Sequence, residues 1–349
     1  MMRLLVNKSK AAILVKQKKP LVIDEIKMPN ELLRGQVLVK LIYSGICGSQ
    51  IGEIEGVKGP DKFLPHLLGH EGIGKVLQIG QDVKKVKKND IVLMHWMKSN
   101  GINSQTPKYT WKNKPLNAGY LTTFNNHAVV SENRLTRINK KKNLKNQLLL
   151  GCTASTSLGT IFNLGKIKRN NRIVVSGCGP IGLYIIKYLK FIGIKDIFSI
   201  DISKNKLNIS KKIGAKKSFL NTYKNKIFDT KDLKNIDYFF ECSGNINVIE
   251  KAFQNIKTTG TLILVGVPPF RKKIKLNSLE IILGKKIIGS KGGGFNANKD
   301  FKKFSKIILS KLPNYNDLIT QEIKLNNINK TISKIKNNQI AGKVIINFK

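Results

Sequence analysis

Near the middle of the chain stands Arg172-Ile-Val-Val-Ser-Gly-Cys-Gly-Pro-Ile-Gly182, a short apolar run followed at once by a GxGxxG motif. The apolar run has the length of a buried strand, and apolar residues then recur at helical spacing up to Gly193. In a strand–turn–helix unit, such glycines permit a tight turn and let the backbone approach a pyrophosphate at the helix N-terminus. The segment therefore predicts a dinucleotide-binding unit, with candidate cofactor contacts at Gly177, Gly179, Pro180, Ile181 and Gly182.

An acidic residue ends the next expected strand, residues 197–200. This residue is Asp201, and it follows the last glycine by about twenty positions, the distance typical of an NAD-binding unit. A carboxylate there can accept hydrogen bonds from the adenosine ribose and repels a 2′-phosphate, so NAD is favoured over NADP. Lys204 and Lys206 weaken this preference because either ammonium group could accommodate that phosphate.

The sequence pattern changes at about residue 165. Before it, short apolar runs such as 37–44, 72–79 and 91–94 lie between turn residues, which predicts short strands there. After it, strand-like and helix-like runs alternate, which predicts a doubly wound parallel sheet. Strands are expected at 172–176, 197–200, 237–241, 260–265 and 286–289, and helices at 181–192, 203–214 and 248–256. Ser203 is expected to cap the second helix, and the tail ends in an apolar run, 343–348.

Length and composition bound the class of protein. With 349 residues, 41% of them hydrophobic, the chain can bury a large core and form two domains or one large α/β domain. Four cysteines are too few for a disulfide-stapled secreted scaffold. Because no segment has the pattern of a secretory signal or a membrane span, we expect a cytoplasmic globular protein with no membrane partner.

The chain is strongly basic, with 63 Lys and Arg against 21 Asp and Glu and a net charge of +42. Only seven of these basic residues are Arg, the residue that nucleic-acid readers use for bidentate contacts. Lys, Asn and Ile are all abundant and share A/T-rich codons, so codon usage explains the charge better than a polyanionic partner. A nucleic-acid partner is therefore disfavoured, although a positive surface would attract an anionic small molecule.

Three candidate metal ligands lie far apart in the sequence: Cys47, His70 and Cys152. Cys47 lies in Gly45-Ile-Cys-Gly-Ser49, and His70 lies in Gly69-His-Glu-Gly-Ile-Gly74. Two thiolates and one imidazole would leave the fourth position of a tetrahedral zinc open, as a catalytic site needs. Spacing alone does not join the three residues.

Taken together, these motifs resemble the zinc-type medium-chain dehydrogenases, the alcohol dehydrogenase superfamily, along the whole chain. Other matching segments are Lys10-Ala-Ala-Ile-Leu14, Glu241-Cys-Ser-Gly244, Val265-Gly-Val-Pro268 and Gly342-Lys-Val344. The resemblance implies an α/β protein with a GroES-like irregular β catalytic domain, residues 1–150 and 290–349, and a Rossmann domain, residues 151–289. It also implies a homodimer or homotetramer.

The resemblance further assigns roles to single residues. Cys47, His70 and Cys152 would be the zinc ligands. Glu71 would be a nearby or alternating ligand, and Ser49 would accept the substrate proton. Val267 would be a further cofactor contact, and Trp96 lies where relatives place a pocket aromatic, although core packing explains it equally well.

The sequence also departs from many relatives at two places. Those relatives hold a second, structural zinc with four closely spaced cysteines, whereas residues 97–120 contain none, so we expect one zinc per chain. They also carry Asp and His at the positions of Gln50 and Gly52, where the His passes the substrate proton to solvent. The usual relay is therefore cut short here. Glu53 and His66 are candidates for its outer end, although each is more often structural or solvated.

The sequence thus predicts a zinc-dependent, NAD-linked dehydrogenase of an alcohol, polyol or sugar, with a small polar substrate. One alternative is a zinc-free enzyme of the quinone-reductase branch, which normally lacks the cysteine and histidine ligands. Another is a basic nucleic-acid-binding or scaffold protein that has retained the fold.

Overall fold

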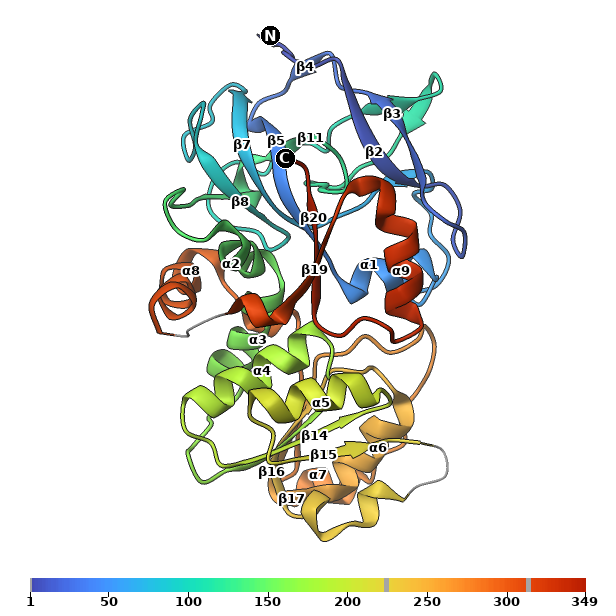
Figure 1. Ribbon diagram of the computed structural model, residues 1–349, viewed down its shortest axis with the longest axis vertical. Helices are drawn as coiled ribbons and strands as arrows, with labels where there is room; N and C mark the ends of the chain where they lie inside the picture. The colour runs from blue at the N-terminus through green and yellow to red at the C-terminus, as the bar shows by residue number, and fades with distance from the viewer. Residues whose placement is uncertain (1, 223–225, 312–314) are drawn as a thin grey trace. The chain divides into compact units, whose positions relative to one another are not determined.

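The computed structural model of the chain describes residues 2–222, 226–311 and 315–349. The chain forms two compact units (Figure 1). The first contains the residues up to Cys152, Asn296–Lys334 and Lys343–Lys349, and the second contains Thr153–Phe295 and Ile335–Gly342.

This division differs from the expected domain ranges on the C-terminal side. Residues 290–295 belong to the second unit, where the Gly293 carbonyl packs so closely on Gly159 that an added Cβ would lie 2.6 Å from it. Ile335–Gly342 also belongs to the second unit, and there Asn338 accepts a hydrogen bond from the Lys206 ammonium at 2.6 Å. The chain therefore passes between the two units more often than the sequence predicts.

The second unit is built on a six-stranded parallel sheet in the order β15-β14-β13-β16-β17-β18. This order, which reverses beside the first strand, is that of a doubly wound Rossmann sheet. The strands are β13 (Arg172–Ser176), β14 (Asp196–Asp201), β15 (Lys217–Leu220), β16 (Ile236–Glu241), β17 (Ile256–Leu264) and β18 (Lys286–Gly289).

One helix precedes the first strand of this unit, and each of the others follows a strand. They are α3 (Thr153–Gly159), α4 (Pro180–Phe191), α5 (Lys204–Ile213), α6 (Ile246–Asn255) and α7 (Ser278–Ile282). Helix α4 contacts α5 and strands β13 and β14, α5 contacts β14 and β15, and α6 contacts β16 and β17. Between α6 and the sheet lies a core that includes Phe239, Phe253 and Leu262, all buried. The predicted strand–helix alternation is confirmed.

Ser203 is the N-cap of α5, as expected, but its side chain makes no capping hydrogen bond; instead its N–H donates to Asp201 Oδ1 at 2.9 Å. The bounds of one strand were wrong. The strand expected at 260–265 begins earlier, at Ile256, directly after α6. The buried partner strand β16 overrides the polar residues at 257–259, which lower the local strand signal.

The first unit is mostly β structure. Its larger sheet has seven strands, in the order β12-β8-β7-β5-β20-β19 with β11 also paired to β5. These strands are β5 (Gln36–Ile46), β7 (Glu71–Ile79), β8 (Ile91–His95), β11 (His127–Ser131), β12 (Leu135–Arg137), β19 (Ile319–Ile323) and β20 (Lys343–Asn347). The sheet therefore joins the N-terminal half of the chain to its last residues.

A five-stranded sheet, a two-stranded sheet and short helices complete the first unit. The five strands are β10 (Lys114–Leu116), β9 (Tyr109–Trp111), β3 (Val22–Lys27), β2 (Lys8–Leu14) and β6 (His66–Leu67), and the pair is β1 (Met2–Arg3) with β4 (Glu31–Leu32). The helices are α1 (Gly48–Ile54), α2 (Leu144–Leu148), α8 (Ala297–Lys306) and α9 (Ile328–Lys336). This irregular β architecture is the one that the resemblance implies.

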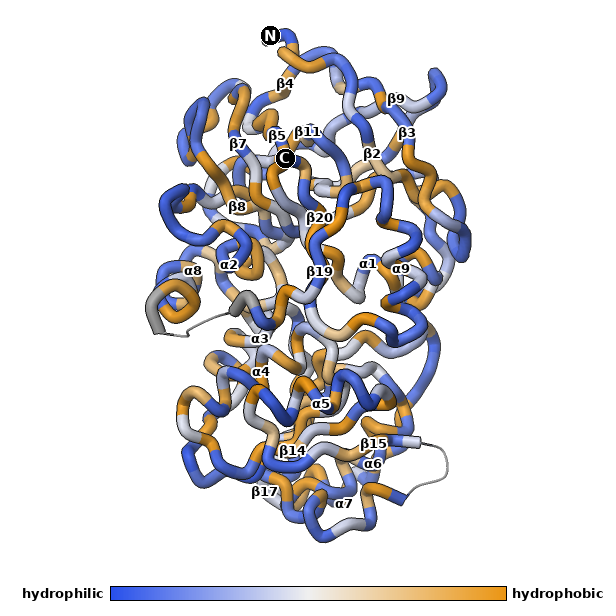
Figure 2. Tube along the Cα trace, in the orientation of Figure 1, coloured by the Kyte–Doolittle hydropathy of each residue, from blue (hydrophilic) through white to orange (hydrophobic). Residues whose placement is uncertain are grey.

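Hydrophilic residues occur on many elements of both units (Figure 2). The lysines thus follow the whole chain rather than one helix or strand. Among the described residues, no helix is long and apolar enough to cross a membrane.

Candidate metal and cofactor sites

The three predicted metal ligands converge in the first unit, together with Glu71. One ligand atom from each of Cys47, His70, Glu71 and Cys152 lies within 4.8 Å of all the others. The two sulfur atoms are 3.9 Å apart. Two thiolates that each bind a tetrahedral zinc at about 2.3 Å would be about 3.8 Å apart, so the observed spacing fits that metal.

Paired strands bring these residues together. Cys47 directly follows β5 and is the N-cap of α1, and His70 directly precedes β7, which pairs with β5. Gly69 makes the turn before His70 with a φ of 97°. An added Cβ at Gly69 would lie 2.3 Å from Thr123 Oγ1, so glycine is required there on both counts.

Two buried polar atoms of this site lack a hydrogen-bond partner among the described residues. These atoms are His70 Nε2 and Glu71 Oε2. Burial of a polar atom without a partner costs free energy, and a bound cation would remove that cost. The donor set and its orphaned atoms therefore fit a zinc ion.

The two thiols differ in acidity. A hydrogen bond with Cys152 lowers the pKa of Cys47 well below its ordinary value, and the nearby His70 acts in the same direction. The same hydrogen bond, together with burial, raises the pKa of Cys152. Because thiolate is the metal-binding form, Cys47 is the thiol of the pair that ionises first, and a bound cation would favour loss of the proton from Cys152 as well.

Lys343 is a residue of this site that the sequence analysis did not single out. It begins β20, is 1% exposed, and its ammonium forms an ion pair with Glu71 Oε1. Burial acts to lower the pKa of Lys343, but the Glu71 carboxylate together with the thiols of Cys47 and Cys152 outweighs it and raises that pKa. The segment Gly342-Lys-Val344 was noted as a match to the family, but only the pairing of β20 with β5 places it beside Cys47.

Helix α1 carries Ser49, Gln50 and Gly52. Ser49 is partly exposed in the first turn, two residues from Cys47. Gln50 is buried, and its side-chain amide contacts the backbone N–H of Cys47 and Nδ1 of His70. A Cβ added at Gly52 would meet Val57 at ordinary contact distance, so this position could accept a Cβ without a clash.

A second group of metal-binding residue types contains Glu53, Asp61 and His66. His66 is buried, with Nε2 2.7 Å from Asp61 Oδ2 and 3.9 Å from Glu53 Oε1. Its Nδ1 lies 3.0 Å from the Leu67 carbonyl and donates to it. The structure thus joins Glu53 and His66, which the sequence analysis named together, and adds Asp61, which it missed because nothing in the spacing singles it out.

The glycine loop of the second unit has room for a pyrophosphate. Gly177 has a φ of 82°, and an added Cβ would lie 2.8 Å from Cys242. At Gly182 an added Cβ would lie 2.1 Å from the Gly177 carbonyl, so both positions require glycine. A Cβ at Gly179 would meet nothing within 4 Å, and this residue caps α4 without a side-chain bond. The open space and the free helix N-terminus fit the phosphates of a dinucleotide.

The other predicted cofactor contacts lie around this loop. Asp201 ends β14 and accepts hydrogen bonds from the N–H groups of Cys178 at 2.7 Å and Ser203 at 2.9 Å. A carboxylate has about four acceptor positions, so Asp201 retains capacity for a ribose hydroxyl. Lys206 is engaged with Asn338, and Val267 is 49% exposed.

Glu241 supports the neighbouring loop and was quoted in the sequence analysis only as part of a matching segment. It is fully buried at the end of β16, and its carboxylate accepts from the N–H groups of Ser243 at 2.8 Å and Gly244 at 2.9 Å. Ser176 donates to it at 3.0 Å, which ties the end of β13 to the same loop. Glu241 therefore fixes the backbone beside the glycine loop.

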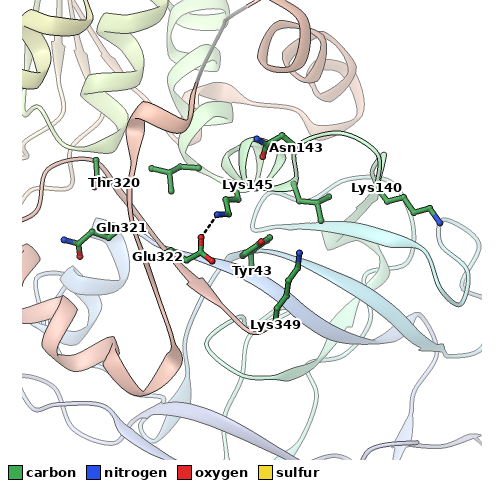
Figure 3. A pocket seen from close by; sticks show the side chains of 10 residues that line it. Tyr43, Lys140, Asn143, Lys145, Thr320, Gln321, Glu322 and Lys349 are labelled. Atoms are coloured by element: carbon green, nitrogen blue, oxygen red, sulfur yellow. Dashed lines mark ion pairs between the residues drawn. The ribbon is translucent and has the colours of Figure 1, made fainter.

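The first unit also contains a cavity of about 550 Å³ between α2 and β19 (Figure 3). Glu322 points toward Lys145 and forms an ion pair with it. The Tyr43 ring lies 5.1 Å from the Lys349 ammonium and 5.9 Å from that of Lys145. None of the predicted site residues lines this cavity.

Comparison with known protein families gives matches in both halves of the chain. Residues 33–140 match the family model "Alcohol dehydrogenase GroES-like domain", and residues 180–310 match the model "Zinc-binding dehydrogenase". Together the two models span more than half of the chain.

Full-length relatives agree with these models. The alcohol dehydrogenase class-3 of Drosophila melanogaster is 28% identical over 96% of this chain and 97% of its own length. An S-(hydroxymethyl)glutathione dehydrogenase of Escherichia coli is 29% identical over 82% of this chain and 85% of its own.

Solved structures share the fold. Benzyl alcohol dehydrogenase from Acinetobacter calcoaceticus superimposes with a TM-score of 0.84 at 19% identity, covering 98% of this chain and 99% of that one. The 2R,3R-butanediol dehydrogenase from Bacillus subtilis gives 0.77 at 22%, covering 97% and 99%. Two family models match this chain, and the relatives match it over most of their length. The chain therefore belongs to the zinc-type medium-chain dehydrogenase/reductase family.

Proposed function

We propose that this protein is a zinc-dependent oxidoreductase that transfers a hydride between NAD and the hydroxyl group of an alcohol, polyol or sugar. The observation that carries the proposal is the convergence of Cys47, His70 and Cys152, with His70 Nε2 buried and without a partner among the described residues. The named relatives are alcohol and hydroxymethylglutathione dehydrogenases, which supports the same class of reaction.

Each residue has a role in this proposal. Cys47, His70 and Cys152 would hold one zinc ion, which when bound would supply a Lewis acid that makes the substrate hydroxyl easier to deprotonate. Ser49 would accept the hydroxyl proton at Oγ, since it lies two residues from Cys47 on α1 and is partly exposed. Glu71, held by Lys343, would place its negative charge beside the ligands.

The second unit would bind the nicotinamide cofactor, which supplies the hydride chemistry. The N–H groups at the start of α4 would bind the pyrophosphate, with Gly179 leaving space for it. Asp201 favours NAD because its negative charge opposes a 2′-phosphate, and Lys206 is already bonded to Asn338. The zinc-free quinone-reductase alternative has no support, because that branch normally lacks the ligands that this chain has at Cys47, His70 and Cys152.

The proposal extends to the setting of the enzyme. A small polar substrate, and an anionic one in particular, suits a protein with a net charge of +42. A homodimer or homotetramer in the cytoplasm, without a nucleic-acid or membrane partner, completes the proposal.

The experiment is a screen for NADH formation across alcohols, polyols and sugar derivatives, with and without a zinc chelator. We expect turnover that the chelator removes and added zinc restores. Cys47→Ser and Cys152→Ser should abolish turnover and leave NAD affinity nearly unchanged, whereas Cys242→Ser, which removes a thiol outside the metal site, should remain active. Turnover that persists in metal-free protein would contradict the proposal.

A further inference from the structure

Gln50 connects two of the proposed zinc ligands. Its side chain is 1% exposed. Its amide oxygen accepts a hydrogen bond from the backbone N–H of Cys47 at 2.9 Å. Its amide nitrogen lies 3.0 Å from Nδ1 of His70. A single amide group therefore contacts both ligands at once.

The directions of these two bonds follow from the chemistry of the groups. The Cys47 N–H can only donate, so it must meet the oxygen of the Gln50 amide. The NH₂ group then faces His70 and donates to Nδ1, which must carry a lone pair. A neutral imidazole with its lone pair on Nδ1 carries its proton on Nε2. Gln50 therefore favours the Nε2–H tautomer of His70.

Metal binding requires the opposite tautomer. The atom of His70 that lies buried without a partner among the described residues is Nε2, and it needs its lone pair to bind a cation. The proton then moves to Nδ1, where it faces the NH₂ group of Gln50, so two donors oppose each other. Rotating the amide by half a turn satisfies Nδ1–H but places the NH₂ group against the Cys47 N–H. In the metal-bound state, Gln50 can therefore satisfy only one of its two neighbours.

We propose that Gln50 is a positioning residue that sets the tautomer of His70 and thereby makes this site bind zinc more weakly than a carboxylate at the same position would. A carboxylate at the same place would accept from the Cys47 N–H and from His70 Nδ1–H together, and it would favour the metal-bound state. This inference rests on the proposed function, because it takes zinc to be the metal.

The test compares wild type with Gln50→Glu, which has nearly the same shape but only acceptors. Zinc affinity of the metal-free, full-length proteins is measured by competition with a chromophoric chelator. Loss of a partner behind a metal-bound histidine typically changes affinity 10–100-fold, so we expect Gln50→Glu to bind zinc about 10–100-fold more tightly. Gln81→Glu adds the same charge at an exposed position of the first unit and should bind zinc like wild type.

A second measurement reads the tautomer directly. Long-range ¹H–¹⁵N correlation spectra of metal-free protein labelled at its four histidines, recorded at pH 9, distinguish a protonated from an unprotonated Nδ1. We expect an unprotonated Nδ1 for His70 in wild type and a protonated one in Gln50→Glu.

The outcomes separate this inference from the proposed function. A protonated Nδ1 in wild type, or equal zinc affinity in wild type and Gln50→Glu, would overturn the role of Gln50. Zinc binding without any dehydrogenase turnover would instead refute the proposed function and leave the role of Gln50 standing. If no variant bound zinc, both the proposed metal and the affinity effect would be rejected.

Discussion

At the scale of single residues, Lys343 and Glu71 form an ion pair that is almost completely buried in the first unit. Removing one partner of a buried pair leaves a charge without compensation, which typically costs about 3–5 kcal/mol. We expect Lys343→Met to lower the free energy of unfolding by that order, and Lys343→Met with Glu71→Gln to recover part of it. Urea unfolding of the metal-free proteins measures both. Equal midpoints for wild type and the single variant would contradict the prediction.

His95 makes the stability of the folded protein depend on pH. Its Nδ1–H donates to the Met97 carbonyl at 2.7 Å, and its Nε2 accepts from the Thr136 hydroxyl at 2.9 Å, so both nitrogens are satisfied in the neutral ring. Burial lowers the pKa of His95 from 6.5 to about 4. Between these values the unfolded chain binds a proton that the folded chain does not, so folding becomes less favourable as pH falls.

The stability that neutral His95 contributes is therefore fully present above pH 6.5 and is lost as pH falls towards 4. His95→Gln removes this titration. The slope of unfolding free energy against pH reports how many more protons the unfolded chain binds than the folded chain. We expect this number to be smaller in His95→Gln than in wild type, by up to one proton. Urea titrations at several pH values between 4 and 7 measure the slope, and identical slopes would show that His95 is not responsible.

At the scale of elements, Glu132 anchors the segment where many relatives hold their structural zinc. It follows β11, and its carboxylate accepts from the N–H groups of Lys84 at 2.6 Å, Lys85 at 2.7 Å and Ile102 at 2.8 Å. Burial acts to raise the pKa of Glu132, but these backbone bonds outweigh it and lower the pKa. The Glu132 carboxylate thus ties together two loops.

Replacement of this carboxylate should loosen the loops. Glu132→Gln keeps the shape but removes the charge and one acceptor, and bonds to charged groups are typically worth about 1.5–3 kcal/mol. We expect a lower thermal midpoint and faster proteolysis within residues 98–117, with zinc content unchanged. Unchanged cleavage in this segment would contradict the anchoring role.

The elements also show how far sequence patterns reach. The strand expected at 172–176 coincides with β13, and the strands expected at 37–44, 72–79 and 91–94 lie within β5, β7 and β8, because local apolar runs and turn residues mark them. The same patterns contain no information on register. Lys343 reaches Glu71 only because β20 pairs with β5 and β5 pairs with β7.

The candidate site follows the same rule. Cys47, His70 and Cys152 were joined only through the resemblance, since their spacing carries no signal. The bridging role of Gln50 could not be predicted, because it depends on the position of His70 beside the first turn of α1. Residue type was predictable and contact was not.

At the scale of the whole molecule, the two units carry different parts of the proposed chemistry. The first unit holds the candidate metal site, and the second holds the glycine loop and Asp201. Loss of the metal should therefore leave cofactor binding intact. Lysines occur along the whole chain, so the positive charge would act on the encounter with the anionic substrate proposed above rather than on one site.

The number of metal ions per chain also belongs to the whole molecule, because two groups of residues could in principle hold one. In the group of Glu53, Asp61 and His66, the polar atoms are already satisfied: His66 bonds the Leu67 carbonyl and Asp61, and Asp61 Oδ1 accepts from the Phe63 N–H at 2.9 Å. In the group around Cys47, His70 Nε2 has no partner among the residues described. We therefore expect one zinc per chain, bound by Cys47, His70 and Cys152.

Elemental analysis of purified variants checks this expectation. Wild type and Asp61→Asn should each contain one zinc per chain, whereas Cys47→Ser should contain close to none, because two remaining ligands hold zinc weakly. A content of two in wild type that falls to one in Asp61→Asn would place a second metal at His66. In that case a metal at Nε2 of His66 would replace the hydrogen bond between that atom and Asp61. The other nitrogen, Nδ1, could keep donating to the Leu67 carbonyl, which leaves Nε2 with the lone pair that a metal requires.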